Sequence, residues 1–170
     1  YVSDPNFKSM ANLIQDGLDN VVLLKTFSKL YSMAGMRVGF AVGAPAIIKM
    51  MKDQVAGEKL NYPGVTAALV SLDDEPFQEY SRASNLESRK ILASCFDKLG
   101  VKYLPSSTNF MFFELNEPIH AFQKKMAARN ILVGRPFPPA MTWCRISLGT
   151  PQEMAYVANE LTKMRAEGVF

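Results

Sequence analysis

The order of short apolar runs and longer amphipathic segments constrains the fold of this 170-residue chain more than any other feature. Val21–Leu24 is a continuous apolar run of the kind found in strands that are buried on both faces, so we expect a central strand there. Further strand-like runs at 37–43, 110–115, 131–133 and 143–148 alternate with helical patterns. This alternation is typical of an α/β protein.

Helical periodicity and capping residues predict the positions of the helices. In chain order, helices are expected over 6–16 (ended by Gly17), from Pro45 onward, in the helix or loop region 63–72, from the acidic entry 73–76 to Leu99, over 118–129, and after Thr150. Gly100 stands where a left-handed helix cap is expected. Thr150-Pro151-Gln152-Glu153 has the spacing of a capping box with proline at the first helical position.

Composition excludes several classes of protein. Cys95 and Cys144 are the only cysteines and His120 is the only histidine, so a disulfide scaffold or a zinc finger lacks its ligands. No apolar run approaches the roughly 20 residues that cross a bilayer. The net charge is only +3, and no basic stripe with interleaved aromatic residues suggests nucleic-acid binding. A reducing compartment such as the cytoplasm fits this cysteine usage.

The polar segment after the first strand carries the strongest chemical signal. Lys29 follows the carboxyl end of the run Val21–Leu24, where open α/β sheets place their ligands. A lysine in a partly desolvated pocket loses its proton more readily and can form a Schiff base with a carbonyl compound. The hydroxyls of Thr26 and Ser28 and the guanidinium of Arg37 suit an anionic group such as phosphate. Without a motif, a solvated surface lysine in a polar turn would be the ordinary interpretation.

The motif around this lysine favours the chemical interpretation. Ser28-Lys29, a loop of small residues and then Gly35-x-Arg37-x-Gly39-Phe40 resemble the cofactor-lysine segment of fold-type-I aminotransferases (class I/II), most closely the histidinol-phosphate aminotransferase branch. Tyr1, Thr108-Asn109-Phe110 and Trp143–Thr150 match further family segments in the expected order, so the resemblance spans essentially the whole chain. It implies an α/β fold of the PLP-dependent transferase (aspartate aminotransferase-like) type. Residues 1–75 would complete the large cofactor-binding domain, and residues 76–170 would form the small C-terminal α+β domain.

The same resemblance assigns cofactor-binding residues. It implies that Lys29 holds pyridoxal 5'-phosphate as an internal aldimine and acts as the catalytic base. Ser28 and Arg37 would bind the cofactor phosphate, with Thr26 as a helper. Tyr1 would hydrogen-bond the phenolic oxygen of the ring, although taken alone it could be a frayed terminus.

Substrate-binding residues also follow from the resemblance. Arg145 would bind the substrate carboxylate, with a surface ion pair as the structural alternative. Asn109 could contact substrate or only satisfy backbone groups at the start of a strand. Arg135 lies in the region where histidinol-phosphate enzymes bind the substrate phosphate, but its context is shifted by one residue, which leaves the substrate open. No metal site is expected.

The implied activity is transfer of an amino group between an amino acid or amino-alcohol phosphate and a 2-oxo acid, by a homodimeric cytoplasmic enzyme of amino-acid biosynthesis. Two alternatives stay open: a PLP-dependent decarboxylase of a phosphorylated amino acid, and an inactive fragment. The fragment alternative arises because the family's aspartate for the pyridinium nitrogen and its ring-stacking residue would precede Tyr1. The chain is therefore expected to be the C-terminal half of the enzyme.

Overall fold

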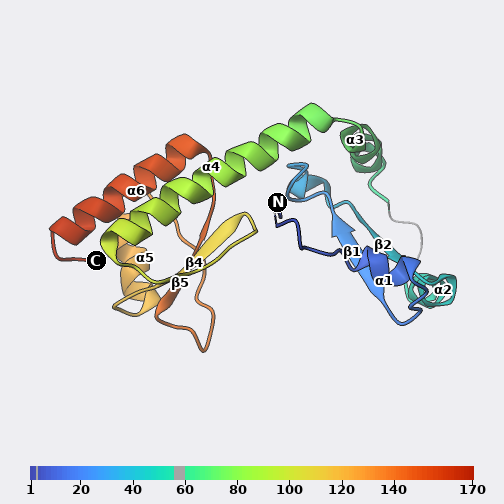
Figure 1. Ribbon diagram of the computed structural model, residues 1–170, viewed down its shortest axis with the longest axis horizontal. Helices are drawn as coiled ribbons and strands as arrows, with labels where there is room; N and C mark the ends of the chain where they lie inside the picture. Colours follow the sequence, from blue (N-terminus) through green and yellow to red (C-terminus); the bar gives the residue numbers. More distant parts are fainter. Residues whose placement is uncertain (3, 56–59) are drawn as a thin grey trace. The chain divides into compact units, whose positions relative to one another are not determined.

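The chain folds into a mixed α/β structure, as the alternation of apolar runs predicts (Figure 1). The computed structural model describes residues 1–2, 4–55 and 60–170. The elements in chain order are α1 (Ala11–Gln15), β1 (Val22–Thr26), the 3-10 helix η1 (Ala34–Met36), β2 (Gly39–Gly43), α2 (Pro45–Asp53), α3 (Tyr62–Leu72), α4 (Glu75–Leu99), β3 (Tyr103–Leu104), β4 (Phe110–Glu114), α5 (Ile119–Ala127), β5 (Trp143–Ser147) and α6 (Pro151–Ala166).

Two compact units divide the chain between Ser81 and Arg82, within the long helix α4. The first unit contains Val2–Ser81, and the second contains Tyr1 together with Arg82–Phe170. Within the residues that the structure describes, no helix is long and apolar enough to cross a membrane.

The Val2–Ser81 unit contains a two-stranded antiparallel sheet of β1 and β2, in register from Val22 opposite Gly43 to Thr26 opposite Gly39. The strand predicted at Val21–Leu24 is therefore confirmed, but its burial on both faces is wrong for the described part of the chain. Leu24 is 70% exposed. A continuous apolar run reports strand propensity, whereas burial requires further layers, and every residue of β1 is at least partly exposed.

The first helix is shorter than periodicity predicts, because α1 begins only at Ala11. The Asp4 carboxylate accepts the backbone N–H of Asn6, and the Ser9 hydroxyl accepts the N–H of Ala11. Short polar side chains that capture nearby N–H groups favour turns over helix, which explains why residues 6–10 stay outside α1. Gly17 ends the segment as expected, with φ of +91°.

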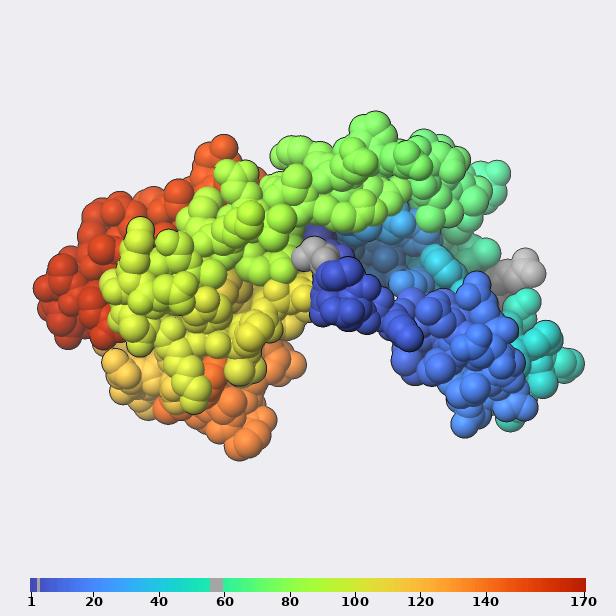
Figure 2. Space-filling view, viewed as in Figure 1, coloured from blue at the N-terminus to red at the C-terminus, as the bar shows by residue number. Residues whose placement is uncertain are grey.

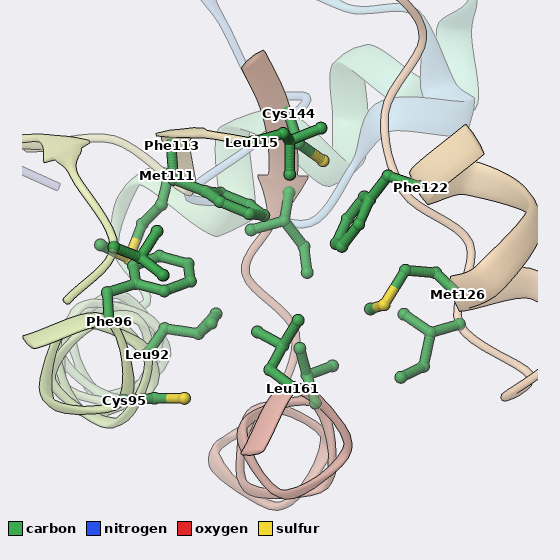
Figure 3. Close-up of a cluster of buried hydrophobic side chains, with 14 of the residues drawn as sticks. Leu92, Cys95, Phe96, Met111, Phe113, Leu115, Phe122, Met126, Cys144 and Leu161 are labelled. Carbon is green, nitrogen blue, oxygen red and sulfur yellow. The ribbon is translucent and has the colours of Figure 1, made fainter. Parts of the chain in front are cut away.

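The Arg82–Phe170 unit has a three-stranded antiparallel sheet in the order β3-β4-β5. Alternate residues of its strands, such as Met111 and Phe113, enter the core and meet α4, α5 and α6 on one face of the sheet (Figure 3). The largest fully buried side chains of this core are Phe96, Phe113, Phe122, Leu92, Met111, Ile119, Met126, Leu161 and Met164. The helices pack on this one face of the sheet, and the residues that alternate with Met111 and Phe113 lie on the other face.

The long helices follow their sequence signals. On α4, Leu92, Cys95 and Phe96 are buried at helical spacing, and Gly100 follows with φ of +65°, as a left-handed cap requires. At the start of α6, the Thr150 hydroxyl accepts the N–H of Glu153, and the Glu153 carboxylate accepts the N–H of Thr150, so the capping box is confirmed.

The strand predicted at Ile131–Val133 is wrong. Asn130 adopts a left-handed conformation with φ of +58°, and the Ile131 N–H closes α5 by donating to the Met126 carbonyl. A bond to β5 appears only at Gly134, whose N–H donates to the Arg145 carbonyl at 2.9 Å. Because the Ile131 N–H is bonded to the end of α5, the run does not pair with the sheet as a strand.

Candidate functional site

A tight turn after β1 presents Lys29. The Thr26 hydroxyl accepts the Ser28 N–H at 3.1 Å and donates to the Ser28 hydroxyl at 2.8 Å. Phe27 is only 4% exposed, and its ring lies 4.8 Å from Tyr31, centroid to centroid. One buried ring thus holds the backbone while Lys29 remains exposed to solvent.

Arg37 reaches the same turn through the pairing of the two strands. Beyond the last sheet pair, the Phe27 N–H donates to the Val38 carbonyl at 3.1 Å, so the antiparallel register continues and brings Arg37 level with Ser28. Arg37 has φ of +53°, which is uncommon for a residue other than glycine, and its Nη1 donates to the Ala34 carbonyl at 2.7 Å. Among described residues, no carboxylate forms an ion pair with its guanidinium.

Asn61 is a positioning residue that the sequence reasoning missed. Its Oδ1 caps α3 by accepting the Gly64 N–H, and its Nδ2 donates to the Met36 carbonyl at 2.8 Å. Gly64 is buried, and a Cβ there would lie 2.7 Å from the Val38 side chain. Asn61 and Gly64 therefore hold α3 against Met36 and Val38, the two neighbours of Arg37 in sequence. An Asn before a Pro-Gly helix start was the available signal, but only for the cap.

The donor set of this turn fits pyridoxal 5'-phosphate. The hydroxyls of Thr26 and Ser28 lie within hydrogen-bond distance of each other, and Arg37 of the opposite strand end carries a guanidinium; these are donor types that suit a phosphate dianion. Lys29 supplies the primary amine that an aldehyde requires, and it forms no ion pair with a carboxylate of the described residues. Thr26, Ser28, Lys29 and Arg37 lie on one hairpin, and their roles toward a cofactor stay a prediction.

In the other unit, Arg145 lies on the sheet face opposite the helices. It stands across from Phe112 in the ladder between β4 and β5, on the face that alternates with the buried residues. A pocket of about 500 Å³ lies over this face. Its lining includes Leu104, Pro105, Ser106, Ser107, Thr108, Phe110, Phe112, Phe137, Pro138, Pro139, Ala140 and Arg145. Arg145 is the charged residue in this mostly apolar lining.

The guanidinium of Arg145 is held by rings rather than by a carboxylate. Its Cζ lies 5.2 Å from the ring centroid of Phe110 and 5.0 Å from that of Phe137. Its Nε is buried without a hydrogen-bond acceptor, and no described carboxylate forms an ion pair with it. The surface ion pair considered as an alternative is therefore absent from the described residues. A half-buried, unneutralised arginine in a pocket favours an anionic ligand.

Two residues of α4, also missed by the sequence reasoning, hold the rim of this pocket. Asn85 Nδ2 donates to the Thr108 carbonyl at 3.2 Å, and Arg89 Nη1 donates to the Ser106 carbonyl at 2.6 Å. Burial lowers the pKa of Arg89 from its ordinary value. Neither residue belongs to a local motif, because each acts on a loop about 20 residues away in sequence.

The remaining candidates are Asn109, Tyr1 and Arg135. The Asn109 carbonyl accepts the Leu148 N–H at 2.9 Å, which serves the sheet, while its side-chain amide makes no hydrogen bond to another described residue. Tyr1 is half-buried and groups with the unit of Arg82–Phe170. Arg135 is exposed beside Phe137, with its Cζ 4.5 Å from the ring centroid.

The thiols and the histidine offer no further chemistry. Burial raises the pKa of Cys144 to about 12 and also raises that of Cys95, so both thiols are protonated near neutral pH. His120 is exposed, and its Nδ1 lies 3.2 Å from Gln123 Oε1. No group of three or more His, Cys, Asp or Glu residues in the described ranges could hold a metal ion.

Comparison with known proteins points to one protein family. The family model for aminotransferase class I and II matches residues 1–161. The histidinol-phosphate aminotransferase of Moorella thermoacetica is 31% identical over 155 residues, which cover 90% of this chain and 40% of that protein. The chain thus spans less than half the length of this curated relative.

Solved structures share the fold. The crystal structure of a putative histidinol-phosphate aminotransferase from Erwinia carotovora atroseptica is 50% identical, with a TM-score of 0.96 over 99% of this chain and 49% of that one. Histidinol-phosphate aminotransferase from Sinorhizobium meliloti, solved in complex with pyridoxal-5'-phosphate, is 25% identical, with a TM-score of 0.77 over 88% of this chain and 42% of that one. The fold expected from the resemblance is confirmed.

Proposed function

This chain belongs to the aminotransferase class I and II family, and from that premise we propose that its protein is a pyridoxal 5'-phosphate-dependent aminotransferase. The observation that carries the proposal is the turn after β1, in which the paired hydroxyls of Thr26 and Ser28 precede Lys29 and the strand register brings Arg37 level with Ser28. This is a phosphate-binding donor set next to a primary amine.

Each residue of the turn has a role suited to its contacts. Arg37 and Ser28 bind the phosphate, and Thr26 orients the Ser28 hydroxyl through the bond between them. When bound, the cofactor supplies an aldehyde for linkage to amines and a ring that withdraws electrons from the substrate carbon. Lys29 Nζ would hold the cofactor at rest, and during turnover it would take the proton from the substrate α-carbon and deliver it to the aldehyde-derived carbon of the cofactor. Tyr1 is proposed to donate a hydrogen bond to the ring oxygen.

Arg145 is proposed to bind the carboxylate of an amino-acid substrate, or the anionic group that replaces it in an amino-alcohol phosphate. A guanidinium presents two parallel N–H donors that match the two oxygens of a carboxylate. The rings of Phe110 and Phe137 lie beside the guanidinium. No carboxylate of the described residues forms an ion pair with it, so none competes with a ligand for its N–H donors. Asn109 is proposed to contact the substrate through its amide.

For the substrate, we propose an amino acid or an amino-alcohol phosphate related to histidinol phosphate, with a 2-oxo acid as amino acceptor. The named activity of the relatives and a second arginine, the exposed Arg135, support an acidic substrate. We also keep as proposals a large-domain part at 1–75, a small domain at 76–170, a cytoplasmic homodimer and a role in amino-acid biosynthesis. Light scattering of the active intact protein should give the mass of a dimer, and an active monomer would contradict that part of the proposal.

The test of the reaction is product analysis with the intact, cofactor-loaded protein. An amino donor such as histidinol phosphate or glutamate should yield its carbonyl product and leave an aminated acceptor, without release of carbon dioxide. Lys29→Ala should abolish turnover because no other described group replaces its amine. Carbon dioxide release with no amino transfer would contradict the proposal and favour a decarboxylase instead.

A further inference from the structure

Arg145 cannot be held in place by electrostatic pairing within the described residues. No carboxylate forms an ion pair with it there, and its buried Nε lacks an acceptor. The contacts that remain are to the rings of Phe110 and Phe137, at 5.2 Å and 5.0 Å from its Cζ. Arginine has many rotamers, so these rings decide how much of its freedom remains when no ligand is bound.

The two rings that contact Arg145 belong to different parts of the fold. Phe110 belongs to the sheet, on the strand next to Arg145. Phe137 belongs to the irregular segment between α5 and β5, which is coloured orange in Figure 2. Its ring contacts a second guanidinium, since the Cζ of Arg135 lies 4.5 Å from its centroid, and it meets Phe112 edge-on with centroids 6.1 Å apart.

The backbone fixes Phe137 relative to the strand that carries Arg145. The Gly134 N–H donates to the carbonyl of Arg145 itself at 2.9 Å, and Gln123 Nε2 donates to the Gly134 carbonyl at 2.9 Å. A Cβ at Gly134 would lie 2.5 Å from the Arg145 carbonyl oxygen, so only glycine allows this approach. The segment is therefore attached to Arg145 at the backbone and again at the side chain.

We propose that Phe137 is a positioning residue for anion recognition, whose ring, which also contacts Arg135, holds Arg145 ready for the substrate carboxylate. The inference rests on the proposed function, because it assumes that Arg145 binds a carboxylate. Stacking uses the flat face of a guanidinium and leaves the in-plane N–H donors for the ligand. An arginine that is already held loses less conformational freedom on binding, so affinity rises without any new contact to the ligand.

A space-filling role for Phe137 makes a different prediction. If the ring only fills volume, leucine should replace it as well as a larger aromatic residue does. If its face is what holds Arg145, then Phe137→Trp or Phe137→Tyr should keep binding, whereas Phe137→Leu should lose it. Trp143→Leu is a matched control, because Trp143 lies on the same strand two residues from Arg145. Its ring contacts the ammonium group of Lys102, and it is not among the residues that line the pocket.

The experiment is calorimetric titration of the intact, cofactor-loaded protein with glutarate, a dicarboxylate without an amino group. We expect Phe137→Leu to raise the Kd for glutarate about 10-fold, with Phe137→Trp and Trp143→Leu within about 3-fold of wild type. The KM for the amino donor should rise in parallel while kcat changes by less than about 3-fold. The affinity for pyridoxal 5'-phosphate should stay unchanged, since the phosphate donors are elsewhere in the chain.

The role of Arg145 is tested separately with Arg145→Lys. If Arg145→Lys binds glutarate like wild type, the proposed role of Arg145 is wrong. If Arg145→Lys loses binding but Phe137→Leu does not, only the positioning role is overturned. Equal weakening in Phe137→Leu and Phe137→Trp would also overturn it, because the aromatic face would then not matter.

Discussion

Phe27 is the residue on which the geometry of the Lys29 turn depends. It is buried between Tyr31 and Phe40, with ring centroids 4.8 Å and 6.0 Å away, and its backbone bonds to both Val38 and Met33. Ser28 and Lys29 follow it directly, and the turn that carries them is closed by hydrogen bonds between Ser28 and Thr26 and from the Ser32 N–H to the Lys29 carbonyl.

Phe27→Ala should lower the free energy of unfolding by about 3 kcal/mol, because it leaves a cavity where a buried ring was. Urea unfolding of the cofactor-free intact protein measures the change. Phe40→Ala is the control, since Phe40 is 47% exposed and should cost clearly less. Equal losses in the two variants would contradict the anchoring role of Phe27.

Cys144 predicts a pH dependence of stability. Burial raises the pKa of its thiol from 9.0 to about 12, so the unfolded chain releases this proton at a lower pH than the folded one. The stabilising contribution is complete below pH 9 and is lost between pH 9 and about 12. The difference in urea midpoint between wild type and Cys144→Ala should therefore narrow as pH rises through this range. A difference that stays constant from pH 8 to 11 would contradict the assignment.

Residues of the candidate site that lie close together in sequence could be predicted, and distant ones could not. Thr26, Ser28, Lys29 and Arg37 form one local pattern, and the hairpin register then brings them together. Asn61 acts on a backbone carbonyl 25 residues away, which no local pattern encodes. The same holds for Phe137, whose contact with Arg145 depends on how an irregular segment crosses the sheet.

At the scale of single elements, the start of α6 is the clearest case of a local signal that determines structure. Thr150→Ala should destabilise the protein by about 1 kcal/mol, because the Glu153 N–H loses its acceptor. The loss should be smaller when Glu153→Ala is already present, since the Glu153 carboxylate accepts both the N–H and the hydroxyl of Thr150 and so helps to hold the cap. Urea unfolding of the two single variants and the double variant measures this coupling, and fully additive losses would contradict the reciprocal cap.

Elements whose identity depends on their neighbours were harder to predict. The run at Ile131–Val133 has strand composition, but the left-handed Asn130 and the closing bond of α5 take its first N–H group. The run at Val21–Leu24 does form a strand, yet its composition says nothing about which layers cover it. Capped and strongly periodic helices such as α4 and α6 were predictable because their signals are internal.

At the scale of the whole molecule, the two units differ in how much core they contain. Of the residues described as buried and hydrophobic, Phe27 and Ala68 belong to the Val2–Ser81 unit, and the others belong to the Arg82–Phe170 unit. The first unit also exposes large apolar side chains, including Leu24, Leu69 and Val70. Its stability should therefore be the lower of the two in the 170-residue chain.

Hydrogen exchange of the 170-residue chain, read by mass spectrometry, tests this difference. Peptides from β4 and the second half of α4 should exchange about 100-fold more slowly than those from β1 and β2, because local opening is easier where fewer apolar contacts are lost. Equal protection in the two units would contradict this account of where the stability lies.

The central claim is that Lys29 holds the cofactor, and one covalent mapping experiment tests it most directly. The intact protein is loaded with pyridoxal 5'-phosphate, reduced with borohydride, digested with trypsin and analysed by mass spectrometry. Because trypsin does not cleave at a modified lysine, a pyridoxyl group on Lys29 should appear on the peptide Thr26–Arg37. Lys29→Ala should fold but carry no specific adduct. A stoichiometric adduct on any other lysine, or none at all in the loaded wild type, would contradict the claim.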